Sequence, residues 1–540
     1  MASQVRRRLI TLSPAIRRQS LIAGLLAFLL FVAEVYWQAP IGFDSRFVLF
    51  AQEMLRHGPT VFPTTYGQPY ADYSAVSTLF VWLLSLPFGA VNAFTAWAPS
   101  AIAGALIVTL MYRLLTPYSR RWALISIALL MLTGAFVTEV RAVSQDLMLA
   151  AVAFAVFYLG YAHDHFGGGG RWPLIFVLLL LGFGIRGPIG LVVPTGMLCS
   201  YYLLNRQWSR LLVFGVLASM LLVVCVGLLL WLAKLSGGPV FMQDVIRMQF
   251  MGRMDGSEGV SGSLYYFTSS LGNYALAYPM ALLALAAAWL SKPHQRGPAL
   301  RLVQYCAAAA LIVMVGLSIP QAKKARYLLP MLPMAAIIAA YPFQVIHGQV
   351  FRWLRGLLLG VWLLTPGLLI AGLLFAQRRF PEQLTEVGVV LIALGVLQLA
   401  ALSRILIPRW RAEVLALCSV LALWTVYVAV FEPVEQRLYD TRTFSRAAFA
   451  QVQQNPAPLV LHGMGKDAKA IKFMVNLEQD LQPQFSETAQ QLEALKGPAW
   501  LMMDRSDFLA LKGTPLENLQ PVLSGPFDKN DYILLYLKPL

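Results

Sequence analysis

The chain has few charged residues and few cysteines for its length. Charged side chains make up 13% of its 540 residues, whereas soluble domains typically carry about 25%. Hydrophobic residues make up 58%, and the mean hydropathy is +0.64, so a soluble protein is excluded and a polytopic membrane protein is predicted. All four cysteines lie inside apolar runs, where free cysteine behaves as a small hydrophobic residue. We therefore expect no disulfide framework, no metal site and no cofactor.

Two further patterns are missing. No internal repeat is evident along the chain. The run Gly463-Met464-Gly465-Lys466 follows an expected strand, but it lacks the spacing and the Ser or Thr of a phosphate loop. An ordinary turn is predicted there.

The net charge of +16 does not indicate a nucleic-acid-binding protein. Lys and Arg fall in short clusters between apolar runs, which is the pattern that sets membrane orientation. Arg6, Arg7, Arg8, Arg17 and Arg18 precede the first apolar run, and no small-residue cleavage site follows it. The sequence therefore predicts a retained N-terminal anchor with the N-terminus in the cytoplasm.

The apolar runs predict about thirteen transmembrane spans. Hydropathy alone gives about fourteen runs, but the distribution of Lys and Arg fits only if residues 75–91 lie in the interface as a juxtamembrane helix. Spans are expected over residues 21–37, 94–115, 122–140, 147–161, 172–185, 189–204, 211–233, 271–290 and 302–319, and from residues 327, 357, 387 and 414 onward. Several runs are shorter than the roughly 20 residues that a crossing needs, so their helices must extend into polar flanks.

Two outer loops stand out in this topology. Asp44 follows the first span and Pro40, so it is expected in a loop near the bilayer surface, where we would look first for chemistry. Lys323, Lys324 and Arg326 lie on the outer side and break the orientation rule. They either bind an anion such as a phosphate at membrane depth, or are solvated or contact anionic lipid.

The composition changes near residue 432. Beyond it, charges are evenly scattered and short β-like runs at 458–461, 499–503 and 532–537 alternate with helix-like stretches at 467–475 and 487–495. The sequence thus predicts a transmembrane domain over residues 1–431 and a small α/β domain over residues 432–540 outside the membrane.

Five short motifs occur in an order that resembles a known family. They are Asp44-Ser45-Arg46-Phe47 with residues 51–55, then residues 67–73, 141–146 and 186–191, and finally KKARYLLPMLP at residues 323–333. This order resembles polyprenyl-phosphate-dependent glycosyltransferases of the GT-C fold. The nearest likeness is to the bacterial lipid A aminoarabinose transferases, which are grouped with the protein O-mannosyltransferases.

The resemblance implies a GT-C membrane fold of helices, with outer juxtamembrane helices, in the bacterial inner membrane. It implies a catalytic Asp44, assisted by Asp146 at the start of the fourth span. The donor is expected to be a sugar on a polyprenyl phosphate, specifically undecaprenyl phosphate, and the transfer is expected to be inverting. The acceptor would be lipid A, another glycan or a protein on the periplasmic face, where the C-terminal domain would also lie.

Residue types suggest roles within this chemistry. An acceptor oxygen needs a general base, for which Asp44 is the candidate, and the leaving phosphate needs preorganised positive charge. The candidates for binding the donor phosphate are Lys323, Lys324, Arg326, Arg186, Arg253 and Tyr327. The candidates for positioning substrates are Arg46, Tyr70, Asp72, Tyr73 and Arg141. Asp146 could position the acceptor or hold Arg46.

Plainer explanations remain open for both acids. Asp44 could pair with Arg46 for solubility, and Asp146 could be a helix N-terminal charge favoured by the macrodipole. The sequence also departs from the family. Ser45 stands where the family has an acid, and no Lys follows Tyr70 where the family has one thought to meet the donor phosphate. Sugar and acceptor are therefore not predicted.

Membrane lipids are expected partners, nucleic acid is not, and no oligomeric state is predicted. The competing function is a lipid or sugar transporter, and a third possibility is a scaffold without activity. Transporter sites usually lie near the bilayer midplane between inverted repeats. Here the polar residues gather in loops on one face, which favours an active site at the membrane surface.

Overall fold

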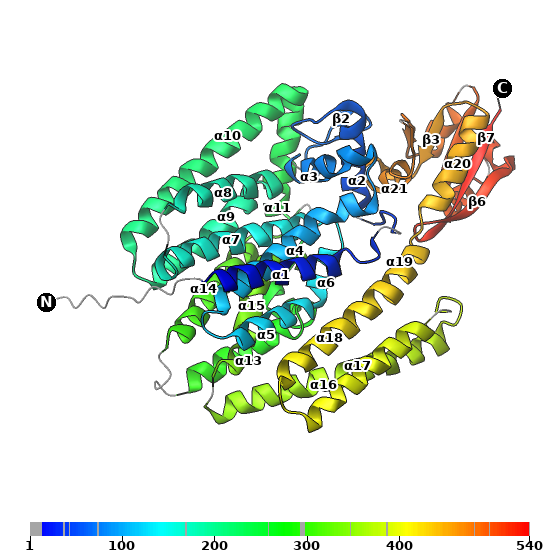
Figure 1. The fold of residues 1–540 in the computed structure, drawn as a ribbon. Helices are drawn as coiled ribbons and strands as arrows, with labels where there is room; N and C mark the ends of the chain where they lie inside the picture. The colour runs from blue at the N-terminus through cyan, green and yellow to red at the C-terminus, as the bar shows by residue number, and fades with distance from the viewer. Residues whose placement is uncertain are drawn as a thin grey trace. The chain divides into compact units, whose positions relative to one another are not determined.

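The computed structural model describes most of the chain as helix (Figure 1). The described residues are 13–35, 38–42, 44–72, 75–167, 170–256, 259–291, 297–345, 347–384, 387–479, 481–495, 497–512 and 514–538. They divide into two compact units. The first comprises Met1–Ala33, Tyr70–Ser77 and Trp97–Val430, and the second comprises Glu34–Pro69, Thr78–Ala96 and Phe431–Leu540. The domain boundary expected at residue 432 stays a prediction.

The first unit is helical. Its α-helices are α1 (Pro14–Phe31), most of α4 (Ala93–Leu115), α5 (Arg120–Met131), α6 (Gly134–Val140), α7 (Gln145–His165), α8 (Trp172–Arg186), α9 (Pro188–Leu204), α10 (Trp208–Ile246), α11 (Gly252–Met254), α12 (Tyr265–Asn273), α13 (Ala277–Leu290), α14 (Pro298–Ser318), α15 (Leu332–Ala339), α16 (Gln349–Arg379), α17 (Gly388–Leu406) and α18 (Arg411–Val426). Shorter helical turns are η3 (Arg247–Met251), η5 (Ala325–Met331), η6 (Tyr341–Phe343) and η7 (Tyr427–Phe431). Helix α7 is almost wholly buried and packs against α8, α9 and η5, whereas α16, α17 and α18 lie side by side (Figure 1).

Among the described residues, nine helices are long and apolar enough to cross a membrane, or up to eleven if two bent pairs count as single spans. The predicted membrane fold is thus confirmed, while the count of about thirteen spans stays a prediction. Helix α3 (Val76–Ser85) has ten residues and is followed by η2 (Leu86–Phe88). Ten helical residues reach about 15 Å, half of the hydrocarbon core. This length agrees with an interfacial helix.

Two expected single spans are bent in the structure. The run at 122–140 forms α5 and α6 at an angle of 74°, and the run at 271–290 falls within α12 and α13 at 111°. At the first bend, the Thr133 hydroxyl donates to the Leu129 carbonyl at 2.9 Å, a local bond that competes with the helix ladder. At the second, Leu276 adopts a positive φ of 67°, which ends a helix. Hydropathy cannot detect either break.

The prediction that Asp44 lies in a loop is wrong. Asp44 is the first residue of α2 (Asp44–His57), in the second unit. Phe47, Phe50, Ala51 and Met54 are all buried, and their spacing of three and four residues is that of an amphipathic helix. A carboxylate in the first turn is also favoured by the helix dipole.

The second unit contains the C-terminal sheet. Its five strands have the order β4-β3-β5-β7-β6. Strand β3 pairs in parallel with β4 and β5, whereas β7 pairs antiparallel with β5 and β6. The strands are β3 (Leu459–His462), β4 (Gln484–Ser486), β5 (Ala499–Asp504), β6 (Pro521–Phe527) and β7 (Asn530–Leu537). The helices are α19 (Glu432–Leu438), α20 (Arg442–Gln454), α21 (Ala470–Met474), α22 (Ala489–Glu493) and α23 (Arg505–Ala510). The α/β prediction is confirmed, although β4 and β6 were not predicted.

The sheet is buried on both faces along β3 and β5, and α20 packs against β6 (Figure 1). Val460, Leu501, Met503, Ile533 and Leu535 form its core. The same unit holds a small hairpin of β1 (Thr64–Thr65) and β2 (Gln68–Pro69). Its turn residues Tyr66 and Gly67 have φ values of 54° and 70°, as a two-residue type I′ turn requires.

A network around Asp504 joins β5 to β7. Burial by itself would raise the pKa of this carboxyl, but hydrogen bonds from Ser506 and Asn530 and the nearby Lys469 ammonium together lower the pKa below its usual value. A carboxyl with a lowered folded pKa stabilises the fold above its unfolded pKa, and this contribution is lost as the pH falls through the folded value.

We therefore expect Asp504→Asn to reduce the stability of the sheet at pH 7 by about 1–3 kcal/mol. The difference from the wild type should shrink below about pH 4. Hydrogen exchange of β5 and β7 in the full chain, corrected for intrinsic rates, measures both. Equal protection of the two proteins at pH 7 would contradict this account.

Candidate active site

One carboxylate in the first unit holds two arginines. Asp146 Oδ1 lies 3.0 Å from Arg186 Nε, and Asp146 Oδ2 lies 3.2 Å from Arg326 Nε. The side chains of Asp146 and Arg186 are 8% and 5% exposed, and that of Arg326 is 24% exposed. We call these three residues the Asp146 triad. Ion pairs at this depth are far less screened than surface pairs.

Asp146 is fixed by the start of α7. The Ser144 hydroxyl caps the helix by accepting from the Leu147 N–H at 3.1 Å. Asp146 lies in the first turn, where the helix dipole favours a carboxylate. The sequence left a choice between a helix-terminal charge and a functional partner, and the structure shows that Asp146 is both helix-terminal and ion-paired.

Arg186 is placed by the tight turn from α8 to α9. Gly187 adopts a positive φ of 63° at this turn. Gly182 and Gly190 lie so close that a Cβ on either would come within 2.2 Å of the carbonyl oxygen of the other. The small residues thus allow the two helices to touch, and the end of α8 carries Arg186 into the site. Arg186 Nη1 also donates to Gln145 Oε1 at 3.0 Å.

Arg326, the third residue of the Asp146 triad, belongs to η5. Arg186 Cζ lies 5.2 Å from the centre of the Tyr327 ring, a cation–π distance. The Tyr274 hydroxyl donates to the Ala325 carbonyl at 2.8 Å and so fixes the start of η5. Just before it, Lys323 Nζ donates to the Ser261 carbonyl at 3.1 Å, while Lys324 is exposed.

Two residues of the site were not predicted. The Ser144 hydroxyl donates to the carboxylate of Glu139, and Glu139 interacts electrostatically with all three residues of the Asp146 triad. Gln145 bridges Arg186 to Ser77, whose hydroxyl accepts from Gln145 Nε2 at 2.6 Å. The sequence does contain a signal for Glu139, because this residue is an acid at the end of an apolar run, only a few residues before Asp146.

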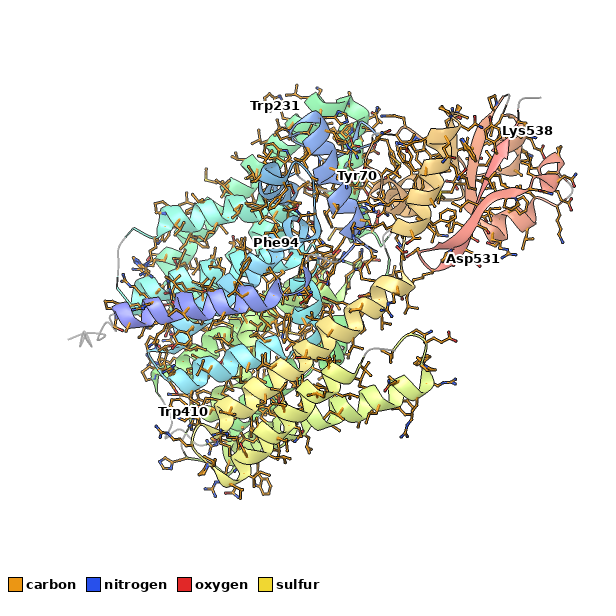
Figure 2. The ribbon with its side chains drawn as sticks, turned by 45° about the vertical axis from the view of Figure 1, so that its right-hand side comes forward. Tyr70, Phe94, Trp231, Trp410, Asp531 and Lys538 are labelled. Carbon is orange, nitrogen blue, oxygen red and sulfur yellow. The ribbon has the colours of Figure 1, made fainter. Side chains whose placement is uncertain are left out.

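For the predicted positioning residues of the first unit, the structure shows the following contacts. Arg141 donates to the carbonyls of Phe31 and Ala33, both at 2.8 Å, at the end of α1. Tyr70, labelled in Figure 2, is buried. Tyr70 and Asp72 flank Ala71, whose carbonyl accepts from Gln249 at 3.2 Å. Tyr73 and the side chain of Arg253 lie outside the described part of the chain.

Asp44 and Arg46 belong to the second unit. Arg46 Nη2 donates to the Asp467 carbonyl at 2.7 Å. Arg46 also lines a cavity of about 370 Å³ with Lys469, Lys472 and Asp528, among others. Within it, Lys472 Nζ lies 2.7 Å from Asp528 Oδ2. The structure thus places Arg46 against the segment before α21.

Comparisons with known proteins support the same fold. A family model described as dolichyl-phosphate-mannose-protein mannosyltransferase matches residues 72–231, a stretch that includes Arg141, Asp146 and Arg186. The undecaprenyl phosphate-alpha-4-amino-4-deoxy-L-arabinose arabinosyl transferases of Pseudomonas paraeruginosa and Pseudomonas aeruginosa are each 27% identical over 399 residues, covering 70% of this chain and 70% of the relative.

Two solved structures of ArnT from Cupriavidus metallidurans are similar over nearly the whole chain. The structure bound to undecaprenyl phosphate has a TM-score of 0.70 at 17% identity, covering 96% of this chain and 98% of the other. The apo structure has the same score and identity, with coverages of 97% and 98%. The resemblance to GT-C glycosyltransferases of the lipid A aminoarabinose transferase and protein mannosyltransferase type is confirmed.

We expect the Asp146 triad to contribute to the thermal stability of the protein. Asp146→Asn leaves Arg186 and Arg326 facing each other without their shared counter-charge, which for a buried pair costs about 3–5 kcal/mol. We expect a lower melting temperature in detergent. Added inorganic phosphate should partly restore it, because a phosphate can replace the carboxylate between the guanidinium groups.

The matched control is Asp164→Asn in the same helix. Asp164 pairs with Arg210 at 2.7 Å, but the Arg210 side chain is 41% exposed. This variant should also melt earlier but should gain nothing specific from phosphate. An Asp146→Asn protein that melts with the wild type would show that the triad does not depend on this charge.

Proposed function

We propose that this chain is an integral membrane glycosyltransferase that moves a sugar from a polyprenyl phosphate, such as undecaprenyl phosphate, to an acceptor on the periplasmic face. The acceptor would be lipid A, another glycan or a protein. The observation that carries the proposal is the Asp146 triad, which holds two guanidinium groups around one buried carboxylate. The curated relatives are named for the use of an undecaprenyl phosphate sugar, which supports the same donor class.

Charge explains why a phosphate suits this site. The cations Arg186, Arg326, Lys323 and Lys324 gather at or beside η5 and the end of α8. Among the described residues, Asp146 and Glu139 are the carboxylates shown to interact with Arg186 and Arg326. Four cations against two carboxylates leave an excess of positive charge. A phosphate can accept several charge-assisted hydrogen bonds and neutralise that excess.

Each charged residue of the site has a proposed role in the reaction. The acceptor oxygen attacks the anomeric carbon, the bond from that carbon to the phosphate oxygen breaks, and the bonding electrons leave with the phosphate. We propose that Arg186 and Arg326 stabilise the charge that grows on that oxygen. Asp146 acts as a positioning residue, because it fixes both guanidinium groups before the donor arrives. Asp44, at the start of α2, is proposed to accept the proton of the acceptor.

The remaining candidates keep their proposed roles. Lys323, Lys324, Arg253 and Tyr327 would contribute to donor binding. Arg46, Tyr70, Asp72, Tyr73 and Arg141 would position substrates, and for Arg46 the cavity that it lines supports such a role. Neither the fold nor the comparisons favour the transporter alternative. The bacterial inner membrane is the proposed location, with the N-terminus in the cytoplasm and the C-terminal domain in the periplasm.

The first test concerns Asp44. Asp44→Asn keeps the shape but removes the base, so we expect the release of polyprenyl phosphate to fall roughly 10²–10⁴-fold. Donor affinity and expression should stay unchanged. Mass spectrometry of envelope lipids and surface proteins from cells with each variant identifies the product.

Asp531→Asn is the matched control, because Asp531 is an exposed carboxylate of the same unit in β7 (Figure 2). Its turnover should equal that of the wild type. Near-normal turnover of Asp44→Asn would remove Asp44 from the mechanism, and loss of donor binding with the fold intact would make it a binding residue.

The second test concerns the donor phosphate. Charge-assisted contacts contribute about 1.5–3 kcal/mol each, so replacing Lys323, Lys324 and Arg326 by Gln should weaken polyprenyl phosphate binding by at least roughly tenfold. Arg326→Gln alone should account for most of the loss, because Arg326 is held in place by Asp146 whereas Lys324 is exposed.

Lys234→Gln, an exposed cation in α10, serves as the control and should bind the lipid normally. Binding is measured by titrating purified protein in detergent with a shortened polyprenyl phosphate. If the triple variant bound as tightly as the wild type, the donor phosphate would have to lie elsewhere.

A further inference from the structure

Four arginines of the first unit line one cavity of about 350 Å³, away from the Asp146 triad in the sequence. They are Arg121, Arg352, Arg355 and Arg411. The walls between them are apolar and include Phe343, Leu359 and Pro408. No acidic residue is among the described residues that line it. We call it the four-arginine cavity.

The partners of these arginines do not balance their charge. Arg121 Nε lies 2.8 Å from Glu413 Oε1. Arg355 donates to the carbonyls of Pro342, at 2.8 Å, and Val345, which are neutral acceptors. Arg411 Nε is buried and has no hydrogen-bond partner among the described residues. Among the described residues, the contacts of these four guanidinium groups therefore include one carboxylate, and at least one buried donor is unsatisfied, which costs free energy.

Helix ends add to the positive potential. Arg121 is in the first turn of α5, Arg411 is the first residue of α18, and Arg352 lies in the first turn of α16. The N-terminus of a helix carries a partial positive charge, so cations there are unfavourable. The orientation rule explains arginines in loops of this kind, but it does not require them to converge on one cavity or to bury an unpaired N–H. An anion in the cavity would explain both.

Two exposed tryptophans support a position of the cavity near the membrane boundary. Trp353 and Trp410 flank lining residues in the sequence and are 71% and 48% exposed. Trp410 directly precedes the first residue of α18 (Figure 2). Exposed tryptophans of membrane proteins gather at the level of the lipid headgroups. Basic pockets between spans at this level bind anionic headgroups.

We propose that the four-arginine cavity binds the phosphate group of an anionic phospholipid from the leaflet at this end of the helices. The guanidinium groups would hold the phosphate, and the apolar walls would contact the first carbons of the lipid. This site is separate from sugar transfer, and the proposal does not depend on that function.

The test measures lipid binding to the purified full chain in a zwitterionic detergent. The probes are dioctanoyl phosphatidylglycerol, dioctanoyl phosphatidylcholine and glycerol 3-phosphate, and the readout is the number and affinity of adducts in native mass spectrometry. We expect the wild type to bind phosphatidylglycerol in preference to phosphatidylcholine. Arg352→Gln with Arg411→Gln should weaken that binding by about tenfold or more.

The matched control removes the same charge nearby. Arg120→Gln with Arg409→Gln replaces two exposed arginines at the same helix ends that do not line the cavity, and it should bind like the wild type. Arg352→Lys with Arg411→Lys keeps the charge and should recover part of the binding, which a merely structural role would not predict.

Three outcomes would overturn the proposal. An equal loss of lipid binding in both double Gln variants would show that the effect comes from net charge alone. Unchanged lipid binding in Arg352→Gln with Arg411→Gln would show that the phospholipid does not bind in this cavity. Glycerol 3-phosphate binding as tightly as phosphatidylglycerol would assign the cavity to a soluble phosphate compound instead of a lipid. If the variant Arg352→Gln with Arg411→Gln has a lower melting temperature than the wild type, the single variant Arg352→Gln, at an exposed position, is used to compare lipid binding instead.

Discussion

The contact on which the site depends is the one between Asp146 and its two guanidinium groups. Arg186 arrives from the end of α8 and Arg326 from η5, so the carboxylate ties together two segments that are distant in the sequence. Without it, two cations would face each other in a poorly screened environment. The cap by Ser144, the glycine contact between α8 and α9, and the anchoring of η5 by Tyr274 all serve to hold these charges in place.

This arrangement also bears on the departures from the family pattern. The Lys thought to meet the donor phosphate is missing after Tyr70, yet the first unit has other cations at hand. Arg186 is buried and already oriented by Asp146, Gln145 and Tyr327. A guanidinium held in this way needs little rearrangement to bind a phosphate. In the proposed function, these guanidinium groups would bind the donor phosphate without that lysine.

Arginines recur in a different arrangement around the four-arginine cavity. In the Asp146 triad, one carboxylate pairs with two guanidinium groups, whereas Glu413, which is not among the lining residues of the four-arginine cavity, pairs with Arg121. The first arrangement preorganises cations, and the second leaves them in excess beside helix N-termini. Both sites have guanidinium groups that suit a phosphate, and the four-arginine cavity also has the exposed Trp353 and Trp410 beside its lining residues in the sequence.

The sequence by itself determined the membrane class, the C-terminal α/β fold and the family resemblance. Hydropathy and β-patterning are sums of local preferences, and the motifs are short stretches of chain. Only the tertiary structure decided that Asp44 begins α2, that two expected spans bend, and that Glu139 and Gln145 join the site. It also decided which cations Asp146 holds. Such pairings depend on close approach between helices far apart in the chain, as at Gly182 and Gly190, and no local preference encodes that approach.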